Sequence, residues 1–230
     1  MRKLISITLV LFCLLLCGCS SVVATGQREL LGLTILIDPG HGDTDVGTIG
    51  VSTGAYEKDT NLQIAKKLKL ALEEHGVIVL MTREDDNPLG PADETDLALR
   101  KEADMLEREK IISEAKANLL VSIHQNAYDE PDVKGPQVFY LQYNNKSYGV
   151  EFAKSLQNAL NNGLKPDSPR NVGSGNWRLL KQGKQPGCIV ECGFFSNPEE
   201  ELLLQQDDYQ NKIVEALVKG IETYVKKYGA

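Results

Sequence analysis

The stretch ILIDPGHG, residues 35–42, joins a short apolar run to a turn and a histidine. The apolar run predicts a buried strand over residues 34–38, and Pro39-Gly40 predicts that the chain leaves this strand in a turn. Further on, Asp59 can cap a helix whose apolar residues share one face, and residues 77–81 form the next apolar run. This order of strand, helix and strand predicts that the two strands pair in parallel.

The same alternation continues to the end of the chain. Helices are expected over residues 97–117 and 147–160 and around 214–225, and strands over 119–123, 137–141 and 187–191. Strands separated by helices of about 15 residues call for a mostly parallel sheet that is covered on both faces. The predicted fold is therefore a single α/β domain over residues 31–230, with a mostly parallel twisted sheet and helices on both faces.

Two segments interrupt this alternation. Residues 84–96 hold six carboxylates together with prolines and a glycine, which favours a solvated loop; binding of a cation or of substrate is the alternative. Residues 161–187 are rich in Gly, Pro, Asn and Lys, which predicts a long irregular excursion near a functional site.

The composition argues against two classes of protein. The chain has 230 residues, with 25 Lys and Arg against 32 Asp and Glu, a formal charge of -7 and 42% hydrophobic residues. This apolar content is typical of a chain with a packed core, so disorder of the whole chain is excluded. No nucleic-acid partner is expected, because none of the charge runs is basic.

Residues 1–24 predict an export leader. Met-Arg-Lys is followed by an apolar run over residues 4–16 and then by small residues, in the order of a signal peptide. Three routes stay open: lipidation of Cys19 in the lipobox-like run LCGC (residues 16–19), ordinary cleavage at VVA (residues 22–24), or an uncleaved anchor. The protein is expected on the outer face of a bacterial membrane, which it contacts only through this leader or a lipid anchor.

Three of the five cysteines lie in that leader. Cys188 and Cys192 are four residues apart in a predicted strand, which separates their Cα atoms by about 13 Å, whereas a disulfide needs less than about 7 Å. Both are therefore expected as free thiols of a buried strand.

Polar side chains stand where predicted strands end. His41 follows the first strand, His124 ends the strand at residues 119–123, and Glu191 ends the last one. Because the carboxyl ends of parallel strands meet at one edge of a sheet, these side chains should converge. Glu57 can join them from the loop before the next helix. Two imidazoles and two carboxylates match a catalytic zinc site, in which three protein ligands leave a position for water.

Such a site predicts metal-assisted hydrolysis. Zinc lowers the pKa of a bound water to about 7 and polarises a scissile carbonyl, while a carboxylate that is not a ligand moves the proton to the leaving nitrogen. The alternative is that each histidine is an ordinary satisfied polar residue at a strand end. His75, next to Gly76 at a predicted helix end, is expected to be structural or solvent-exposed.

Five motifs occur in the order found in one family of hydrolases. They are ILIDPGHG (35–42), YEK followed by NL (56–62), VLMTR (79–83), SIHQNA (122–127) and VECGFFSN (190–197). From about residue 34 to its end the chain resembles zinc-dependent N-acetylmuramoyl-L-alanine amidases. The resemblance implies one zinc ion (Zn2+) per chain, with His41, Glu57 and His124 as metal ligands and Glu191 as the catalytic general base and acid. It also implies hydrolysis of the amide between the lactyl group of N-acetylmuramic acid and the L-alanine of the stem peptide, with peptidoglycan stem peptide and glycan as partners.

Within that family the chain is most similar to the germination-specific, spore-cortex branch. The similar features are its compact length, the run GPQVFY (135–140), Arg170, and Leu179-Leu180 before Pro186. That branch removes stem peptides so that another enzyme can form muramic-δ-lactam in cortex peptidoglycan, which implies a place in the forespore and cortex space. Asp43 departs from the family because it stands where a second glycine is common, and DVG (45–47) replaces a usual Asp-Pro-Gly. Asp43 can alter the loop that presents the first histidine and thereby metal affinity, which leaves room for an accessory envelope protein.

Asn126, Arg83 and Trp177 have two interpretations each. Asn126 orients substrate or a ligand, or else forms a turn. Arg83 binds a stem-peptide carboxylate, or else packs against the acidic loop. Arg170 and Trp177 lie where glycan or peptide can rest, although a lone tryptophan more often belongs to the core. Asp38 is expected to shape the turn after the first strand.

Two rival functions stay open. A non-catalytic peptidoglycan-binding scaffold would keep the fold without turnover, which the presence of all four presumed site residues disfavours. A zinc peptidase or deacetylase would use the same chemistry on another cell-wall amide, and only the motif match separates it from an amidase.

Overall fold

The computed structural model describes residues 29–144 and 146–229. The predicted leader, residues 1–24 with the lipidation candidate Cys19, lies outside these ranges. Within them, no helix combines the length and the apolar character needed to cross a membrane.

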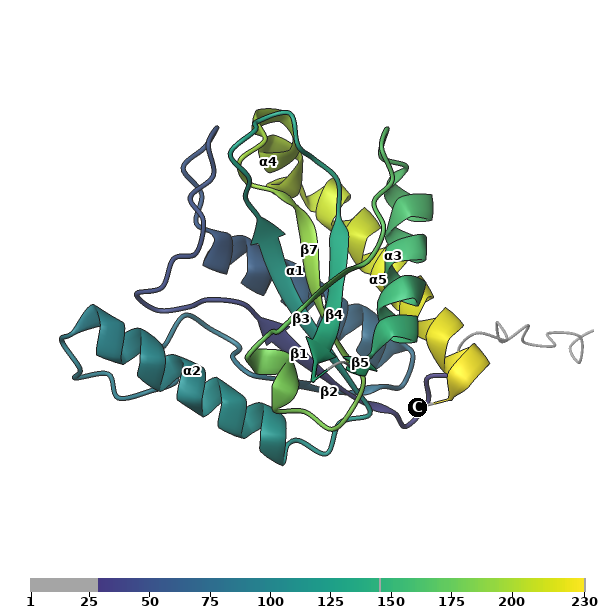
Figure 1. Ribbon diagram of the computed structural model, residues 1–230, viewed down its shortest axis with the longest axis horizontal. Helices are drawn as coiled ribbons and strands as arrows, with labels where there is room; N and C mark the ends of the chain where they lie inside the picture. Colours follow the sequence, from purple (N-terminus) through teal and green to yellow (C-terminus); the bar gives the residue numbers. More distant parts are fainter. Residues whose placement is uncertain (1–28, 145, 230) are drawn as a thin grey trace, which may run out of the picture.

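A central sheet organises the described part of the chain (Figure 1). β1 pairs in parallel with β2 and β3, and β3 pairs in parallel with β7, so the prediction of a mostly parallel sheet is confirmed. The strand order is β2-β1-β3-β7-β4-β5, with β6 beside β4. The strands are β1 (Thr34–Pro39), β2 (Ile78–Met81), β3 (Leu119–Asn126), β4 (Gln137–Tyr143), β5 (Lys146–Tyr148), β6 (Gly173–Gly175) and β7 (Gly187–Phe194).

Helices cover both faces of this sheet, as predicted. On one face, α1 (Glu57–Glu74), α3 (Val150–Leu164) and α5 (Asp207–Tyr228) bury their apolar sides against the strands. On the other face lie α2 (Leu97–Glu114) and a 3-10 turn (Leu179–Lys181). The short helix α4 (Pro198–Leu204) follows β7 at the edge where the parallel strands end, at the top of Figure 1.

The two apolar clusters follow the alternation of side chains along the strands. Ile35, Val121 and Val190 point to the face of α1, α3 and α5, whereas their strand neighbours Leu36 and Ile189 point to the face of α2. Helix α2 buries little: of its residues only Arg108 and Ile112 are buried. Polar contacts must therefore contribute much of what holds α2 to the rest of the molecule.

The structure differs from the sequence expectations in a few places. β4 runs antiparallel to β7. This direction could not be predicted, because an apolar strand pattern is the same in both directions. β3 and β7 extend past the expected ends, so that His124 and Glu191 lie within strands and face each other in register. The excursion before β7 is partly ordered, since it contains the end of α3, β6 and the 3-10 turn. Cys188 and Cys192 are buried free thiols, as expected.

Candidate active site

The predicted site residues meet in an open cavity at the carboxyl ends of β1 and β3. His41, Glu57, His124 and Glu191 all line this cavity of about 360 Å³, and so does Asn126. Residues separated by 150 positions in the chain are thus brought together by the parallel pairing of β1, β3 and β7.

Three of these side chains converge on one point. Oε1 of Glu57 lies 3.2 Å from Nε2 of His41 and 3.1 Å from Nδ1 of His124. One ligand atom from each residue lies within 4.8 Å of the other two. Two imidazole nitrogens and one carboxylate oxygen are a donor set that catalytic zinc accepts, with a coordination position left for another ligand. The three residues therefore fit a zinc ion.

Two glycines allow the backbone to approach these ligands. A Cβ at Gly40 would lie 2.2 Å from ring atoms of His124, and a Cβ at Gly47 would lie 2.6 Å from Oε2 of Glu57. Any larger residue at either position would have to displace a presumed metal ligand. The spacing of the site thus depends on residues that carry no side chain.

Glu57 is held by the start of helix α1, of which it is the first residue. Its Oε2 accepts a hydrogen bond from the N–H of Thr48 at 2.8 Å, and its Oε1 accepts one from the N–H of Gln125 at 3.0 Å. Burial works against the charged form, but His124 and His41 outweigh it and lower the pKa of Glu57. Glu57 therefore stays a carboxylate, the form that binds a metal.

Asp45 fixes the orientation of the first histidine. Nδ1 of His41 donates to Oδ2 of Asp45 at 2.8 Å, which leaves Nε2 to face Glu57. Lys101 of α2 holds the other oxygen of Asp45 at 3.0 Å. Burial opposes protonation of His41, but Asp45 and Glu57 outweigh it and raise the pKa of His41 to about 9. The site thus attracts positive charge, and a metal ion bound there has to displace a proton from His41.

Glu191 lies next to this group without belonging to it. It faces His124 across the β3–β7 pair. Its Oε2 is buried and, among the described residues, has no hydrogen-bond partner. Burial raises the pKa of Glu191 to about 7. A carboxylate with an unpartnered oxygen and a pKa near neutrality is suited to accept a proton and to return it.

The turn that presents His41 has an unusual backbone. His41 and Asp43 have φ values of 61° and 51°, in the left-handed region that residues with a Cβ seldom adopt. Asp43 is held there by an ion pair with Arg100 of α2. Its N–H also donates to Asp86 of the acidic loop at 2.9 Å. The carboxylate of Asp43 thus contributes contacts that a glycine cannot make.

Arg108 of α2 holds this turn through hydrogen bonds, and the sequence pattern did not identify it as a residue of the site. Its guanidinium is 2% exposed and donates to Asp38 at 2.6 Å and to the carbonyls of Pro39 and His41 at 2.8 Å each. The signal that could have revealed it is a charged residue one helical turn before the buried Ile112. The expectation that Asp38 shapes the turn agrees with its fully buried contacts to Arg108, Thr82 and Ser122.

Arg83 also lies under the turn and does not line the cavity. It is 4% exposed, and it donates to the carbonyls of Pro39, Gly40 and Lys58 at 2.8–3.1 Å. It also donates to the carbonyl of Asp85 in the acidic loop. The structure therefore places Arg83 in contact with backbone, including the acidic loop, and away from the cavity where substrate would bind.

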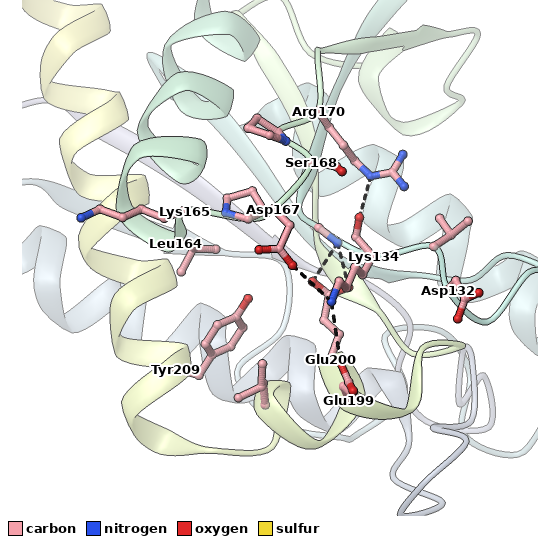
Figure 2. A pocket seen from close by; sticks show the side chains of 15 residues that line it. Asp132, Lys134, Leu164, Lys165, Asp167, Ser168, Arg170, Glu199, Glu200 and Tyr209 are labelled. Carbon is pink, nitrogen blue, oxygen red and sulfur yellow. Dashed lines mark hydrogen bonds and ion pairs between the residues drawn. The ribbon is translucent and has the colours of Figure 1, made fainter.

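The other candidates occupy different places. Asn126 lines the cavity, and its Oδ1 accepts from the N–H of Ala127 as a turn-former would. Arg170 lies in a second cavity (Figure 2). Trp177 is half-buried and packs edge-on against Phe139 with ring centroids 5.4 Å apart. His75 ends α1 with Nδ1 2.8 Å from the carbonyl oxygen of Ala71, which confirms a structural role.

Comparison with known proteins agrees with this geometry. The family model described as N-acetylmuramoyl-L-alanine amidase matches residues 35–223, which include every residue of the cavity named above. The chain belongs to the N-acetylmuramoyl-L-alanine amidase family. The resemblance expected from the five motifs is thereby confirmed.

Individual relatives show which amidases this chain is similar to. The germination-specific N-acetylmuramoyl-L-alanine amidase of Bacillus subtilis is 35% identical over 200 residues, which are 87% of this chain and 83% of that protein. The amidase LytC of the same organism is 31% identical, and the match covers 87% of this chain but 37% of LytC. Among solved structures, the CwlD amidase of Clostridioides difficile, in complex with the GerS lipoprotein, has a TM-score of 0.81 at 34% identity and covers 85% of this chain and 100% of that one.

Proposed function

We propose that this amidase hydrolyses the amide bond between N-acetylmuramic acid and L-alanine in peptidoglycan, with one zinc ion held by His41, Glu57 and His124. The observation that carries the proposal is the convergence of these three ligand atoms beside Glu191, a half-buried carboxylate with an unpartnered oxygen. When bound, zinc supplies a Lewis acid that polarises the scissile carbonyl and acidifies water.

The residues of this chain have separate roles in the proposed reaction. Glu191 takes a proton from the attacking water and returns it to the nitrogen of L-alanine as the C–N bond breaks. The unpartnered Oε2 of Glu191 beside the presumed metal ligands suits both steps, since the group has to gain and lose the proton within one turnover. Asp45 keeps His41 in one orientation, and Asn126 is placed to contact substrate at the rim of the cavity.

The proposal extends to a role in the spore cortex. In this role the enzyme removes stem peptides before muramic-δ-lactam is formed. The similarity to the germination-specific amidase of Bacillus subtilis supports it. The CwlD amidase of Clostridioides difficile is found with a lipoprotein, which supports an accessory envelope partner for this chain too. The predicted leader supports a location outside the cytoplasm, where that substrate and that partner would be met.

The cavity argues against one of the two rival functions and does not separate the other from an amidase. A scaffold without turnover would not need a half-buried Glu191 with an unpartnered oxygen next to three presumed metal ligands, because an unsatisfied buried oxygen lowers stability. A peptidase or deacetylase would use the same four groups, so the reaction product has to distinguish it from an amidase.

The test is product analysis by mass spectrometry. Muropeptides that carry stem peptides are incubated with the purified protein, with and without added zinc. Release of intact peptides that begin with L-alanine supports the proposal; cleavage between amino acids or loss of acetyl groups contradicts it. Glu191→Gln should keep zinc and lose turnover, whereas His124→Ala should lose both. His75→Ala is the matched control, because the third histidine lies at the far end of α1 and should affect neither.

A further inference from the structure

A second cavity lies beside the catalytic one at the same edge of the sheet. It measures about 520 Å³ and is formed by the loop before β4, the segment that follows α3, helix α4 and the start of α5 (Figure 2). Leu164, Leu203 and Tyr209 form its apolar side, and its charged lining residues are Lys134, Lys165 and Arg170 against Asp132, Asp167, Glu199 and Glu200. A concave surface with an apolar side and fixed polar groups is typical of a site that binds part of a ligand.

Arg170 is held in place in a way that leaves its terminal nitrogens available. Its Nε donates to the carbonyl of Lys134 at 3.0 Å (Figure 2), and its guanidinium carbon lies 4.7 Å from the centre of the Phe194 ring. Among the described residues, neither Nη atom forms a hydrogen bond or an ion pair. A half-buried guanidinium that is fixed at Nε and stacked on a ring is pre-organised to bind a carboxylate with both Nη atoms.

The supports of Arg170 are themselves buried. The Glu200 carboxylate, 5% exposed, accepts from the N–H of Gly135 at 2.9 Å and from the N–H of Phe194 at 2.7 Å. The carbonyl of Arg170 accepts from Nδ2 of Asn161 at 2.9 Å. Hydrogen bonds therefore hold the backbone of Phe194, Gly135 and Arg170 before any ligand binds, which lowers the entropy cost of binding.

Two chains of contacts connect this arginine to the catalytic cavity. Phe194 lies three residues beyond Glu191 on β7, so that their Cα atoms are about 10 Å apart along the strand, and its partner in the sheet is Asn126 of the cavity rim. In addition, the carbonyl of Asn171 accepts from Nε2 of Gln137 at 3.0 Å, and Gln137 is paired directly with Glu191. A peptide of three extended residues spans about 10 Å.

We propose that Arg170 binds a carboxylate of the peptide half of the substrate, two or three residues beyond the amide that is cleaved. This inference rests on the proposed function, because it takes the scissile amide to lie at Glu191. The peptide then runs from the catalytic cavity along the end of β7 to the second cavity. Asp167 and Glu199, each 3.6 Å from Nζ of Lys134, border the site and reject a second carboxylate there.

The test compares two substrates and two variants of the full-length protein. One muropeptide carries free carboxylates beyond L-alanine, and the other carries carboxamides at the same positions. For the wild type, the acidic substrate should have a KM lower by roughly 10-fold or more, as expected for a charge-assisted pair. Arg170→Gln should remove this preference through KM, with kcat changed less than about threefold, and Arg170→Lys should restore part of it. Arg178→Gln is the matched control, because this exposed arginine of the same excursion pairs with Glu102 and Glu109 instead.

Direct binding of the free stem peptide, measured by calorimetry, separates this inference from the proposed function. Peptide binding that is lost in Arg170→Gln supports the inference even if the wild type cleaves another amide, in which case only the proposed function fails. If the wild type does not distinguish the acidic from the amidated peptide, or if Arg170→Gln keeps KM and peptide affinity within twofold of the wild type, the inference is overturned while amidase activity stands. Equal thermal midpoints for Arg170→Gln and the wild type exclude misfolding as the cause of a change.

Discussion

Replacement of Arg108 by methionine tests whether a buried ion pair holds the catalytic turn. In the wild type the guanidinium connects α2 to Asp38 and to the carbonyl of His41. Methionine fills a similar volume but cannot donate a hydrogen bond. Arg108→Met therefore leaves the fully buried Asp38 with only the hydroxyls of Thr82 and Ser122.

The magnitude follows from the pKa of Asp38. Burial alone would raise it, but Arg108 and the hydrogen bonds from Ser122 and Thr82 outweigh burial and lower the pKa from 3.8 to about 2. This difference corresponds to about 2 kcal/mol of stability at neutral pH. Removal of one partner of a buried pair costs about 3–5 kcal/mol in other proteins. We expect Arg108→Met to lower the free energy of unfolding by about 2–5 kcal/mol.

Urea unfolding measures this loss. The fluorescence of Trp177, the single tryptophan of the chain, reports on its packing against Phe139. The midpoint should fall at an unchanged m value. Lys110→Met is the matched control on the same helix, since Lys110 forms an exposed ion pair with Glu107, and its midpoint should match the wild type.

A double variant makes the reasoning refutable. Asp38→Asn combined with Arg108→Met removes the unpaired buried charge, so this protein should be more stable than Arg108→Met alone. If the single variant lost less than about 1 kcal/mol, or if the double variant were no more stable than it, the ion pair would not be what holds the turn.

Three more outcomes are expected. Gly40→Ala should lower zinc affinity in a chelator competition, because its Cβ would lie 2.2 Å from the ring of His124; an unchanged affinity would show that the ring is free to move. Asp45→Asn should weaken zinc binding by about 10- to 100-fold in the same assay, since the carboxylate that orients His41 is lost, and wild-type affinity would contradict this. The stability that the lowered pKa of Asp38 contributes is fully present above pH 4 and lost as the pH falls towards 2; Asp38→Asn should flatten this part of a urea-midpoint series against pH, and an equal slope in both proteins would disprove it.

Much of the site could be predicted from local sequence pattern. An apolar run followed by Pro39-Gly40 identifies a strand that ends in a turn, and the residue after such a turn stands at the edge of a parallel sheet. His41, His124 and Glu191 could be grouped on this basis alone. Glu57 could be added because it stands in the predicted loop just before Asp59, the expected cap of the next helix.

Other parts of the site depend on contacts that no local pattern reveals. The direction of β4 was not predicted, because alternation along a strand carries no direction. Arg83 and Arg108 stand in a strand motif and in a charged helix, and nothing near them in the chain shows that both donate to the carbonyl of Pro39. Asp45 was noted only as part of a departure from a family motif, and its bond to His41 appears only once the turn is folded.

The amino-acid sequence by itself determined which chemical groups are available: two imidazoles and a carboxylate at strand ends, a second carboxylate at a helix start, and an arginine in an irregular excursion. It did so because hydrophobic periodicity and turn residues act over a few neighbouring positions. Only the tertiary structure decided how these groups are arranged around one another. Glu57 meets both histidines while Glu191 keeps a free oxygen, and Arg170 is stacked on Phe194 with its terminal nitrogens open. These differences come from pairing between distant strands and from burial, which change the pKa and the available bonding partners of groups that are identical in the unfolded chain.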